Sequence, residues 1–207
     1  MDAERHLFPV VRKGKWGAID SRGEVVIEPR YEGLWNLSGG LLGFSDGRRG
    51  GLMDTAGRVV RDQGPYDEIR EFRQGRAVVR LGKKFGYIDR DFREVVPPRF
   101  DFAYEFGDGL AFVEQGKWRG YIAPNGETLF ELPAGMRGDV FSGGRAMVVA
   151  RNKRGYIDRA GELVIPTRFV DGRRFSEGSA AVSLSLGQEG RVGFIDERGE
   201  FVFEPDL

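Results

Sequence analysis

The sequence predicts an all-β protein made of six tandem repeats of about 35 residues, each a three-stranded antiparallel meander. The first observation is the glycine content, 32 of 207 residues, which is about twice the usual share of roughly 7%. The second is a short phrase, "KWGAID", whose variants return five more times. The third is a second glycine series, in the pattern F-x-x-G, that keeps the same period. The phrase glycines are Gly17, Gly51, Gly86, Gly120, Gly155 and Gly193, and the second series is Gly40, Gly75, Gly109, Gly144 and Gly178.

Each repeat contains three predicted strands. The first is a short run rich in valine and alanine, such as "RAVVR" at 76–80, typical of a buried strand. The second is the phrase itself, "GYID" at 86–89, reached through a short glycine-bearing turn. The third is a run such as "EVVIEP" at 24–29, which we expect to end at its proline, because proline cannot donate to a strand ladder.

The turns on either side of the phrase carry opposite charges. The turn that leaves it has the pattern D-x-x-G, as in "DSRGE", where the aspartate can accept backbone N–H groups and the glycine suits a positive φ. Phe92 replaces that glycine in one copy, so it is either strained or in a different turn. The turn that enters the phrase is basic. Stacked repeats would thus have one positive and one negative rim, unless the charges simply keep the turns solvated.

Large apolar side chains recur at two positions in the connection between repeats. We interpret them as plugs that fill the space between successive repeats, with ligand stacking as the less favoured alternative. The first position holds Tyr31, Tyr66, Phe100 and Phe169, and the second holds Leu37, Phe72, Phe106 and Phe175.

The composition argues against several classes of function. The 32 basic and 32 acidic residues cancel, which disfavours a nucleic-acid binder. With no cysteine and with His6 as the one histidine, we expect no metal site, no cofactor and no catalytic triad. The chain as given shows neither a signal peptide nor a membrane-spanning segment, so we expect a cytoplasmic protein with no membrane partner. Turn carboxylates such as Asp20 and Glu24 recur in several repeats, which favours a structural cause over a hydrolase.

These segments resemble the WG-repeat family of bacterial tandem-repeat proteins. The matching segments are "GKWGAIDSRGEVVIEPRYE", "KKFGYIDRDFREVVPPRFD", "KRGYIDRAGELVIPTRF" and "FSEGSAAV". The resemblance covers nearly the whole chain, and it implies a repeat array that serves as an interaction module without a shared activity.

We therefore expect one domain over residues 1–207, with repeats near 6–39, 40–74, 75–108, 109–143, 144–177 and 178–207. The assembly is predicted to be an open twisted or superhelical array, with a closed six-bladed, propeller-like ring as the alternative, because three strands are fewer than the usual four per blade. The predicted function is a non-enzymatic scaffold for protein–protein interaction. A carbohydrate-binding module that stacks sugars on Trp35, Tyr104 or Trp118 is the alternative, and a hydrolase ranks last.

The predicted partner-binding residues depart from the repeat pattern or lie in its basic turns. Trp35, Phe102 and Tyr104 are rings beyond the two plug positions, and interface hot spots favour tryptophan, tyrosine and arginine. The full predicted set is Trp35, Tyr104, Phe102, Phe92, Arg48, Arg49, Lys83 and Lys84. The partner is expected to be another protein whose identity, like the oligomeric state, is open.

Overall fold

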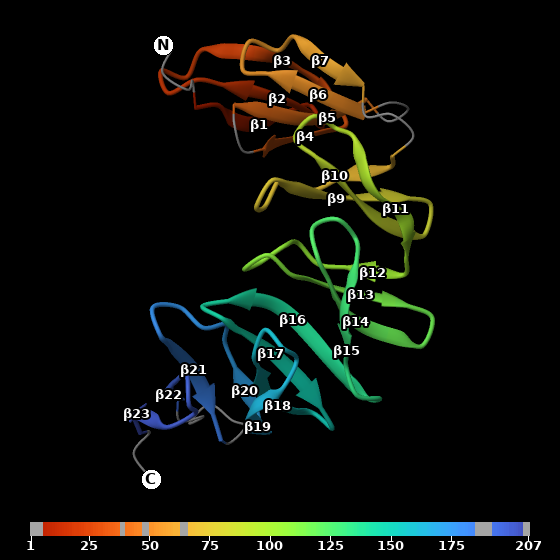
Figure 1. The fold of residues 1–207 in the computed structure, drawn as a ribbon. Coiled ribbons are helices and arrows are strands. Elements are labelled where there is room, and N and C mark those ends of the chain that lie inside the picture. The colour runs from red at the N-terminus through yellow and green to blue at the C-terminus, as the bar shows by residue number, and fades with distance from the viewer. Residues whose placement is uncertain (1–5, 38–39, 47–49, 63–65, 185–191, 205–207) are drawn as a thin grey trace. The chain divides into compact units, whose positions relative to one another are not determined.

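The computed structural model describes residues 6–37, 40–46, 50–62, 66–184 and 192–204. Their regular structure is β-strand alone, in six small antiparallel sheets (Figure 1), which confirms the all-β prediction. None of these residues belongs to a helix that could cross a membrane. The chain divides into two compact units, Met1–Pro98 and Arg99–Leu207, described separately below.

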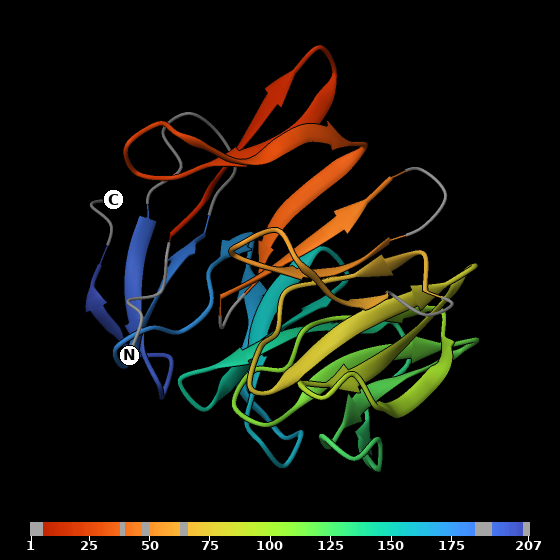
Figure 2. The same ribbon diagram turned by 90° about the horizontal axis from the view of Figure 1, so that it is seen from above.

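Each sheet is a meander of strands that are consecutive in the sequence, as both ribbon views show (Figure 1 and Figure 2). The first sheet contains β1 (Phe8–Arg12), β2 (Lys15–Ile19) and β3 (Val25–Tyr31). The second contains β4 (Gly33–Leu37), β5 (Leu41–Ser45), β6 (Gly50–Asp54) and β7 (Val59–Asp62). The third contains β8 (Glu68–Ile69), β9 (Arg76–Leu81), β10 (Lys84–Asp89) and β11 (Glu94–Phe100). The fourth contains β12 (Phe102–Ala103), β13 (Ala111–Gln115), β14 (Trp118–Ile122) and β15 (Thr128–Glu131). The fifth contains β16 (Met136–Ser142), β17 (Arg145–Ala150), β18 (Lys153–Ile157) and β19 (Leu163–Phe169). The sixth contains β20 (Asp171–Gly172), β21 (Ser179–Ser183), β22 (Val192–Asp196) and β23 (Phe201–Phe203).

Five of the six sheets have a fourth strand that the sequence analysis missed. It lies in the segment that we interpreted as a connection between repeats, and it pairs with the valine-rich strand, as Ala103 does with Val113. These five strands, β4, β8, β12, β16 and β20, lie at one edge of their sheets, and we call them the added strands. Four strands are the usual number in a propeller blade, so the argument against a ring from three strands per repeat is wrong. The choice between an open array and a ring stays a prediction.

The third predicted strand does not end at its proline, contrary to our expectation. Strand β19 runs through Pro166 to Phe169, because the chain bulges away from its neighbour there. Arg154 pairs with Phe169 and Tyr156 pairs with Ile165, so this stretch of β19 holds two more residues than the facing stretch of β18. A bulge leaves its residues out of the hydrogen-bonded ladder, and proline is tolerated there because it needs no donor.

The phrase glycine faces this bulge, which explains why glycine recurs there. A Cβ added to Gly155 would lie 2.8 Å from the Thr167 nitrogen and closer still to the Ile165 carbonyl oxygen. The same crowding by bulge backbone occurs at Gly17 and Gly86. The glycine is required by this close approach of two main chains and not by a positive φ.

The arginine that follows the bulge proline makes two side-chain contacts in the second unit. The guanidinium of Arg168 lies 5.0 Å from the ring centre of Phe169 and donates a hydrogen bond of 2.9 Å to the Gly199 carbonyl. Arg99 does the same over Phe100, at 4.9 Å, and donates to the Gly126 carbonyl at 3.2 Å. Each cation–π contact lies within one strand, and the hydrogen bond of Arg168 links the fifth sheet to the sixth.

The acidic turns have the predicted structural role. One carboxylate oxygen of Asp158 accepts hydrogen bonds from the backbone N–H groups of Ala160 and Glu162, at 2.9 and 3.0 Å. The aspartates of four other turns accept the same two bonds: Asp20, Asp54, Asp89 and Asp196. Within a sheet the basic and acidic turns lie at opposite ends of the phrase strand, as predicted.

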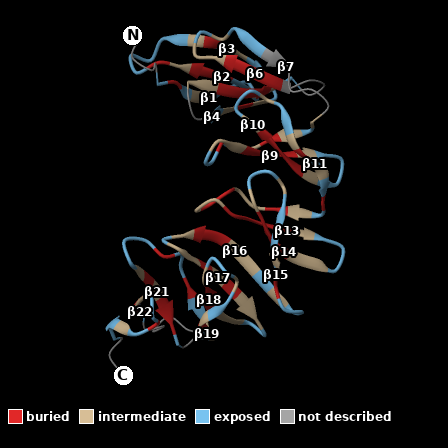
Figure 3. Ribbon diagram, in the orientation of Figure 1, coloured by how far each residue is buried: buried red, intermediate tan, exposed pale blue. Residues whose placement is uncertain are grey.

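The predicted plugs are buried in the cores of the sheets. Figure 3 shows buried residues in the middle of the sheets and exposed ones at the hairpin tips. Exposed fractions of the rings range from 0% at Phe169 to 6% at Tyr31. The buried plugs are Tyr31, Phe72, Phe100, Phe106, Phe169 and Phe175. Tyr66 is half-buried, and the side chain of Leu37 lies outside the described residues.

Phe92 adopts the same acidic turn as the other repeats, with its backbone at a positive φ that is strained for a residue other than glycine. Its φ is +59°, in the left-handed region where the glycines of the other turns have values of +77° to +87°, and its N–H donates to the Asp89 carbonyl at 2.9 Å. Its ring packs edge-to-face on Phe72 with centres 5.4 Å apart. A bulky side chain at positive φ is unfavourable, so the contact with Phe72 offsets part of the backbone cost.

A double-mutant cycle separates the two effects at Phe92. Phe92→Gly alone should change the free energy of unfolding by less than about 1 kcal/mol, because relief of strain and loss of the ring contact oppose each other. With Phe72→Leu already present, the same change should stabilise by about 1 kcal/mol, since only the relief remains. Urea unfolding of the four proteins measures this difference. Equal effects of Phe92→Gly in both backgrounds would contradict the compensation.

Candidate interaction surface

Trp35, a predicted partner-binding residue, packs its ring over a glycine of the neighbouring strand. It lies on β4 directly opposite Gly43, and a Cβ added to Gly43 would lie 2.6 Å from the ring carbon Cζ2 and closer still to Nε1. The side chain is half-buried. Trp118 is also half-buried and covers Gly120 in the same way, at 2.7 Å. Both indoles thus fill space left by a glycine in the neighbouring position of the sheet.

Phe102 and Tyr104 are joined to the core of the second unit. Their rings meet edge-to-face at 4.8 Å, and each lies within 6.5 Å of the buried Phe112. The guanidinium of Arg137 covers Phe102 at 5.1 Å and is itself held by Glu114 at 2.7 Å. Burial raises the pKa of the Tyr104 hydroxyl. These contacts favour a packing role for the pair.

The other predicted site residues are not gathered around these rings. Lys83 and Lys84 are exposed at one end of β10, whereas Phe92 follows the other end of that strand. Arg48 and Arg49 lie outside the described residues. The predicted set is divided between the two units, with Trp35, Phe92 and the two lysines in the first unit and Phe102 and Tyr104 in the second.

Two hollows in the second unit open along one segment, residues 170–174, which we call the β20 segment. The larger has a volume of about 580 Å³ and the smaller about 490 Å³. The larger, which we call the hairpin hollow, is lined by Val149, Arg151, Asn152, Lys153, Arg154, Val170 and Asp171. The smaller is lined by Asp139, Met147, Gly172, Arg173 and Arg174.

Small side chains on β20 leave these hollows open. The pair Asp171 and Gly172 occupies the positions that Phe102 and Ala103 hold in the fourth sheet, as their pairing with β21 and β13 shows. Glycine is needed at position 172, because a Cβ added there would lie 2.8 Å from the Tyr156 hydroxyl oxygen. The sequence already shows this difference, since one repeat has "FVDGRRF" where another has "FDFAYEF". The prediction selected the segment with the extra rings Phe102 and Tyr104, whereas the hollows lie along the segment without extra rings.

Hydrogen bonds fix the backbone of the β20 segment from the fifth sheet. The Tyr156 hydroxyl donates to the Arg173 carbonyl at 2.8 Å, and burial raises the pKa of Tyr156 to about 12. Arg154 donates to the Val170 carbonyl and pairs with the Asp171 carboxylate at 3.4 Å. Because both ends of the segment are held, the hollows are formed before any ligand arrives.

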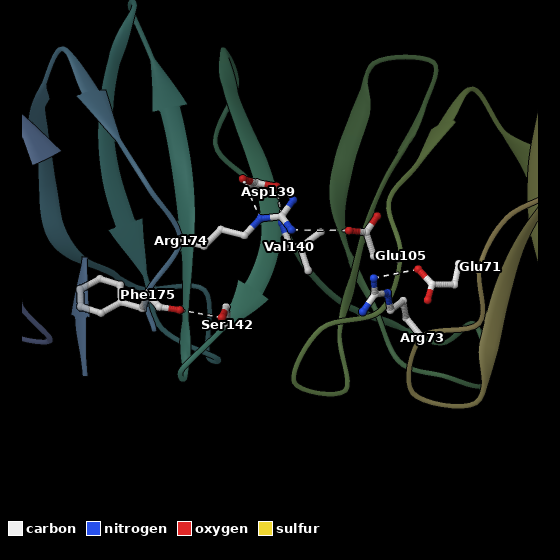
Figure 4. Close-up of polar contacts among 8 residues, drawn as sticks. All are labelled: Glu71, Arg73, Glu105, Asp139, Val140, Ser142, Arg174 and Phe175. Carbon is white, nitrogen blue, oxygen red and sulfur yellow. Dashed lines mark hydrogen bonds and ion pairs between the residues drawn. The ribbon is translucent and has the colours of Figure 1, made fainter. Parts of the chain in front are cut away.

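A charged network adjoins the smaller hollow (Figure 4). The guanidinium of Arg174 lies 2.7 Å from an Asp139 oxygen and 3.5 Å from a Glu105 oxygen, and the hydrogen bond to Asp139 raises the pKa of Arg174. The Ser142 hydroxyl donates to the Phe175 carbonyl at 2.6 Å. These contacts orient the arginine along the rim of the hollow.

The chemistry of this surface suits binding. Its cationic groups can hold carboxylates, and Val149, Val170 and Met147 can contact apolar side chains. Over the described ranges, no group of three or more histidine, cysteine, aspartate or glutamate side chains is arranged to hold a metal ion.

Solved structures with a similar fold have very different sequences. Hsv2 of Kluyveromyces lactis with loop 6CD replaced by a Gly-Ser linker has a TM-score of 0.58 and 10% identity, over 92% of this chain and 73% of that one. A second Kluyveromyces lactis Hsv2p structure has a TM-score of 0.53 and 12% identity, over 92% and 70%. A eukaryotic initiation factor has a TM-score of 0.64 and 11% identity, over 96% and 62%. The similarity is one of fold, of the β-propeller-like repeat type.

The sequence comparisons agree with the repeat structure. No curated protein matches the chain. The family model described as "WG containing repeat" matches residues 16–47, 66–85, 85–117 and 155–185, which together make up more than half of the sequence. The chain therefore belongs to the WG-repeat family, and the recurring phrase is the strand and turn of that repeat.

Proposed function

We propose that this chain is a non-enzymatic repeat scaffold that binds another protein along the β20 segment. One observation carries the proposal: two hollows flank a single five-residue segment that the fifth sheet holds in place. A protein partner suits this surface because its lining alternates aliphatic and charged groups. Interfaces of this kind combine apolar contacts with charge-assisted hydrogen bonds, and arginine is enriched in them.

Site-specific crosslinking in the source cells tests this proposal. A photo-crosslinking amino acid in place of Asp171, in the hairpin hollow, should yield a discrete protein adduct that mass spectrometry can identify. The same group in place of Arg22, an exposed turn residue of the first sheet, should not yield that adduct. Identical adducts from both positions, or none from position 171, would contradict binding along the β20 segment.

A further inference from the structure

The hairpin between β17 and β18 has an arginine at a left-handed turn position that glycine occupies in two related hairpins. Ala150 pairs with Lys153, so Arg151 and Asn152 form the turn, with φ values of +49° and +60°. The first turn residue is Gly82 between β9 and β10 and Gly116 between β13 and β14, with φ near +60° in each, although the second residue of those turns lacks the positive φ of Asn152. In the hairpin between β1 and β2 the first turn residue is Lys13, with φ +52°. Glycine adopts this conformation without a steric cost, whereas arginine does not. The strained position therefore retains a charged side chain that folding does not require.

Arg151 and Lys153 have no ion pair or side-chain hydrogen bond with any described residue, whereas Arg154 has both. Among the described residues that line the hairpin hollow, Asp171 is the one acidic residue, and it is engaged with Arg154. The hollow thus presents two cations that are not neutralised within the described part of the chain. A cation of this kind can donate a charge-assisted hydrogen bond to a ligand carboxylate.

The walls of the hollow favour an acidic protein segment over a nucleic acid. Val149 and Val170 give it apolar contacts that aliphatic side chains can use and a chain of phosphates cannot. The protein as a whole has 32 basic and 32 acidic residues, so it lacks the excess positive charge of a general nucleic-acid binder. A volume of about 580 Å³ is in the range of sites that hold several side chains.

We propose that the hairpin hollow recognises an extended acidic segment of the partner, in which Asp or Glu side chains bind Arg151 and Lys153 and intervening aliphatic side chains contact Val149 and Val170. This inference rests on the proposed function and names the chemistry of the partner. It assigns a role in recognition to Arg151, whose backbone has a positive φ.

The test uses a labelled heptapeptide, Glu-Val-Glu-Val-Glu-Val-Glu, with the full chain in a fluorescence anisotropy titration. The chain should bind this peptide, and the affinity should fall as salt rises, because the contacts are between charges. The matching Gln-Val peptide should bind at least about tenfold more weakly, a difference of roughly 1.4 kcal/mol. Equal binding of the two peptides would overturn the proposal.

Two variants locate the binding. Arg151→Gly should reduce peptide affinity about five- to tenfold, as expected for one charge-assisted contact, without lowering the thermal midpoint, because glycine suits the turn. The matched control is Lys13→Gly, which also removes a cation from a left-handed hairpin position, φ +52°, but in the first sheet; affinity should not change. Unchanged affinity in Arg151→Gly, or equal losses in both variants, would overturn the proposal.

The outcomes distinguish this inference from the function on which it rests. A crosslinked partner at position 171, together with no binding of the Glu-Val peptide, would reject the acidic segment and leave the scaffold proposal standing. Single-stranded DNA that binds more tightly than the peptide, with the same loss in Arg151→Gly, would assign the hollow to nucleic acid and overturn the inference.

Discussion

Gly155→Val is expected to lower the free energy of unfolding by about 3 kcal/mol, because the added side chain meets main-chain atoms that cannot rotate away. A Cβ at this position would lie 2.8 Å from both the Pro166 carbonyl carbon and the Thr167 nitrogen. Relief would require the bulge in β19 to move, and that bulge positions Arg168, which donates to the Gly199 carbonyl of the sixth sheet. Equilibrium unfolding in urea measures the change.

Gly144→Ala is the control for this variant. Gly144 has a φ of +76°, and a Cβ added there would meet nothing within 4 Å. The control therefore carries only the backbone cost of a left-handed alanine, about 1 kcal/mol. A loss at Gly155 no larger than the loss at Gly144 would contradict the close approach of strand and bulge.

Tyr156→Phe should lower the free energy of unfolding by about 1 to 2 kcal/mol near neutral pH. The variant leaves the Arg173 carbonyl without the hydroxyl that donates to it at 2.8 Å, and an unsatisfied buried polar group is costly. Tyr31→Phe is the comparison, since the Tyr31 hydroxyl accepts from the Arg30 side chain and supports no backbone segment; its loss should be smaller. A neutral Tyr156→Phe would show that the β20 segment is held without this bond.

The same tyrosine predicts how stability depends on alkaline pH. Burial raises the pKa of Tyr156 to about 12, from an ordinary value of 10.0. Above pH 10 the unfolded chain releases this proton while the folded chain retains it, so stability is fully present below pH 10 and declines as pH rises toward 12. In Tyr156→Phe this part of the decline should disappear. Parallel pH profiles of the variant and the parent above pH 10 would contradict the assignment.

The repeat was predictable from the sequence because its strongest signals are local. Period, phrase and turn chemistry depend on residues close together in the chain, as in the turn that Asp158 caps. Three of the added strands were missed because they are short: β8, β12 and β20 have two residues each. The longer β4 and β16 each contain a glycine and at least one polar residue, so their sequences do not read as buried strands. Such segments become strands through pairing with a neighbour and not through their own propensity.

The proline error has a related cause. Proline usually marks the end of a strand because it lacks a donor, but Pro166 lies in a bulge whose residues need none. The bulge depends on the facing Gly155, which is eleven residues earlier in the chain. In the sequence, Gly155 can be explained as a strand glycine and Pro166 as the end of a strand. Only the pairing of β18 with β19 shows that the glycine makes room for the bulge that contains the proline.

The surface was the least predictable part. Extra rings such as Phe102 attract attention in a sequence, yet this ring packs on Phe112 and under Arg137. The smaller hollow lies where the side chains are small, at Gly172. In a sequence, a small residue indicates a binding surface less clearly than an aromatic residue does. Without a structure, a glycine among 32 gives no reason to be singled out.

One labelling experiment tests the central claim, that a partner binds along the β20 segment, most directly. The chain contains no cysteine, so Arg173→Cys and Arg22→Cys each introduce a single thiol, one in the smaller hollow and one in an exposed turn of the first sheet. With the crosslinked partner purified and added in excess, the maleimide labelling rate at position 173 should fall at least about tenfold, while the rate at position 22 stays unchanged. Undiminished labelling at position 173, in a complex shown to have formed, would contradict the account.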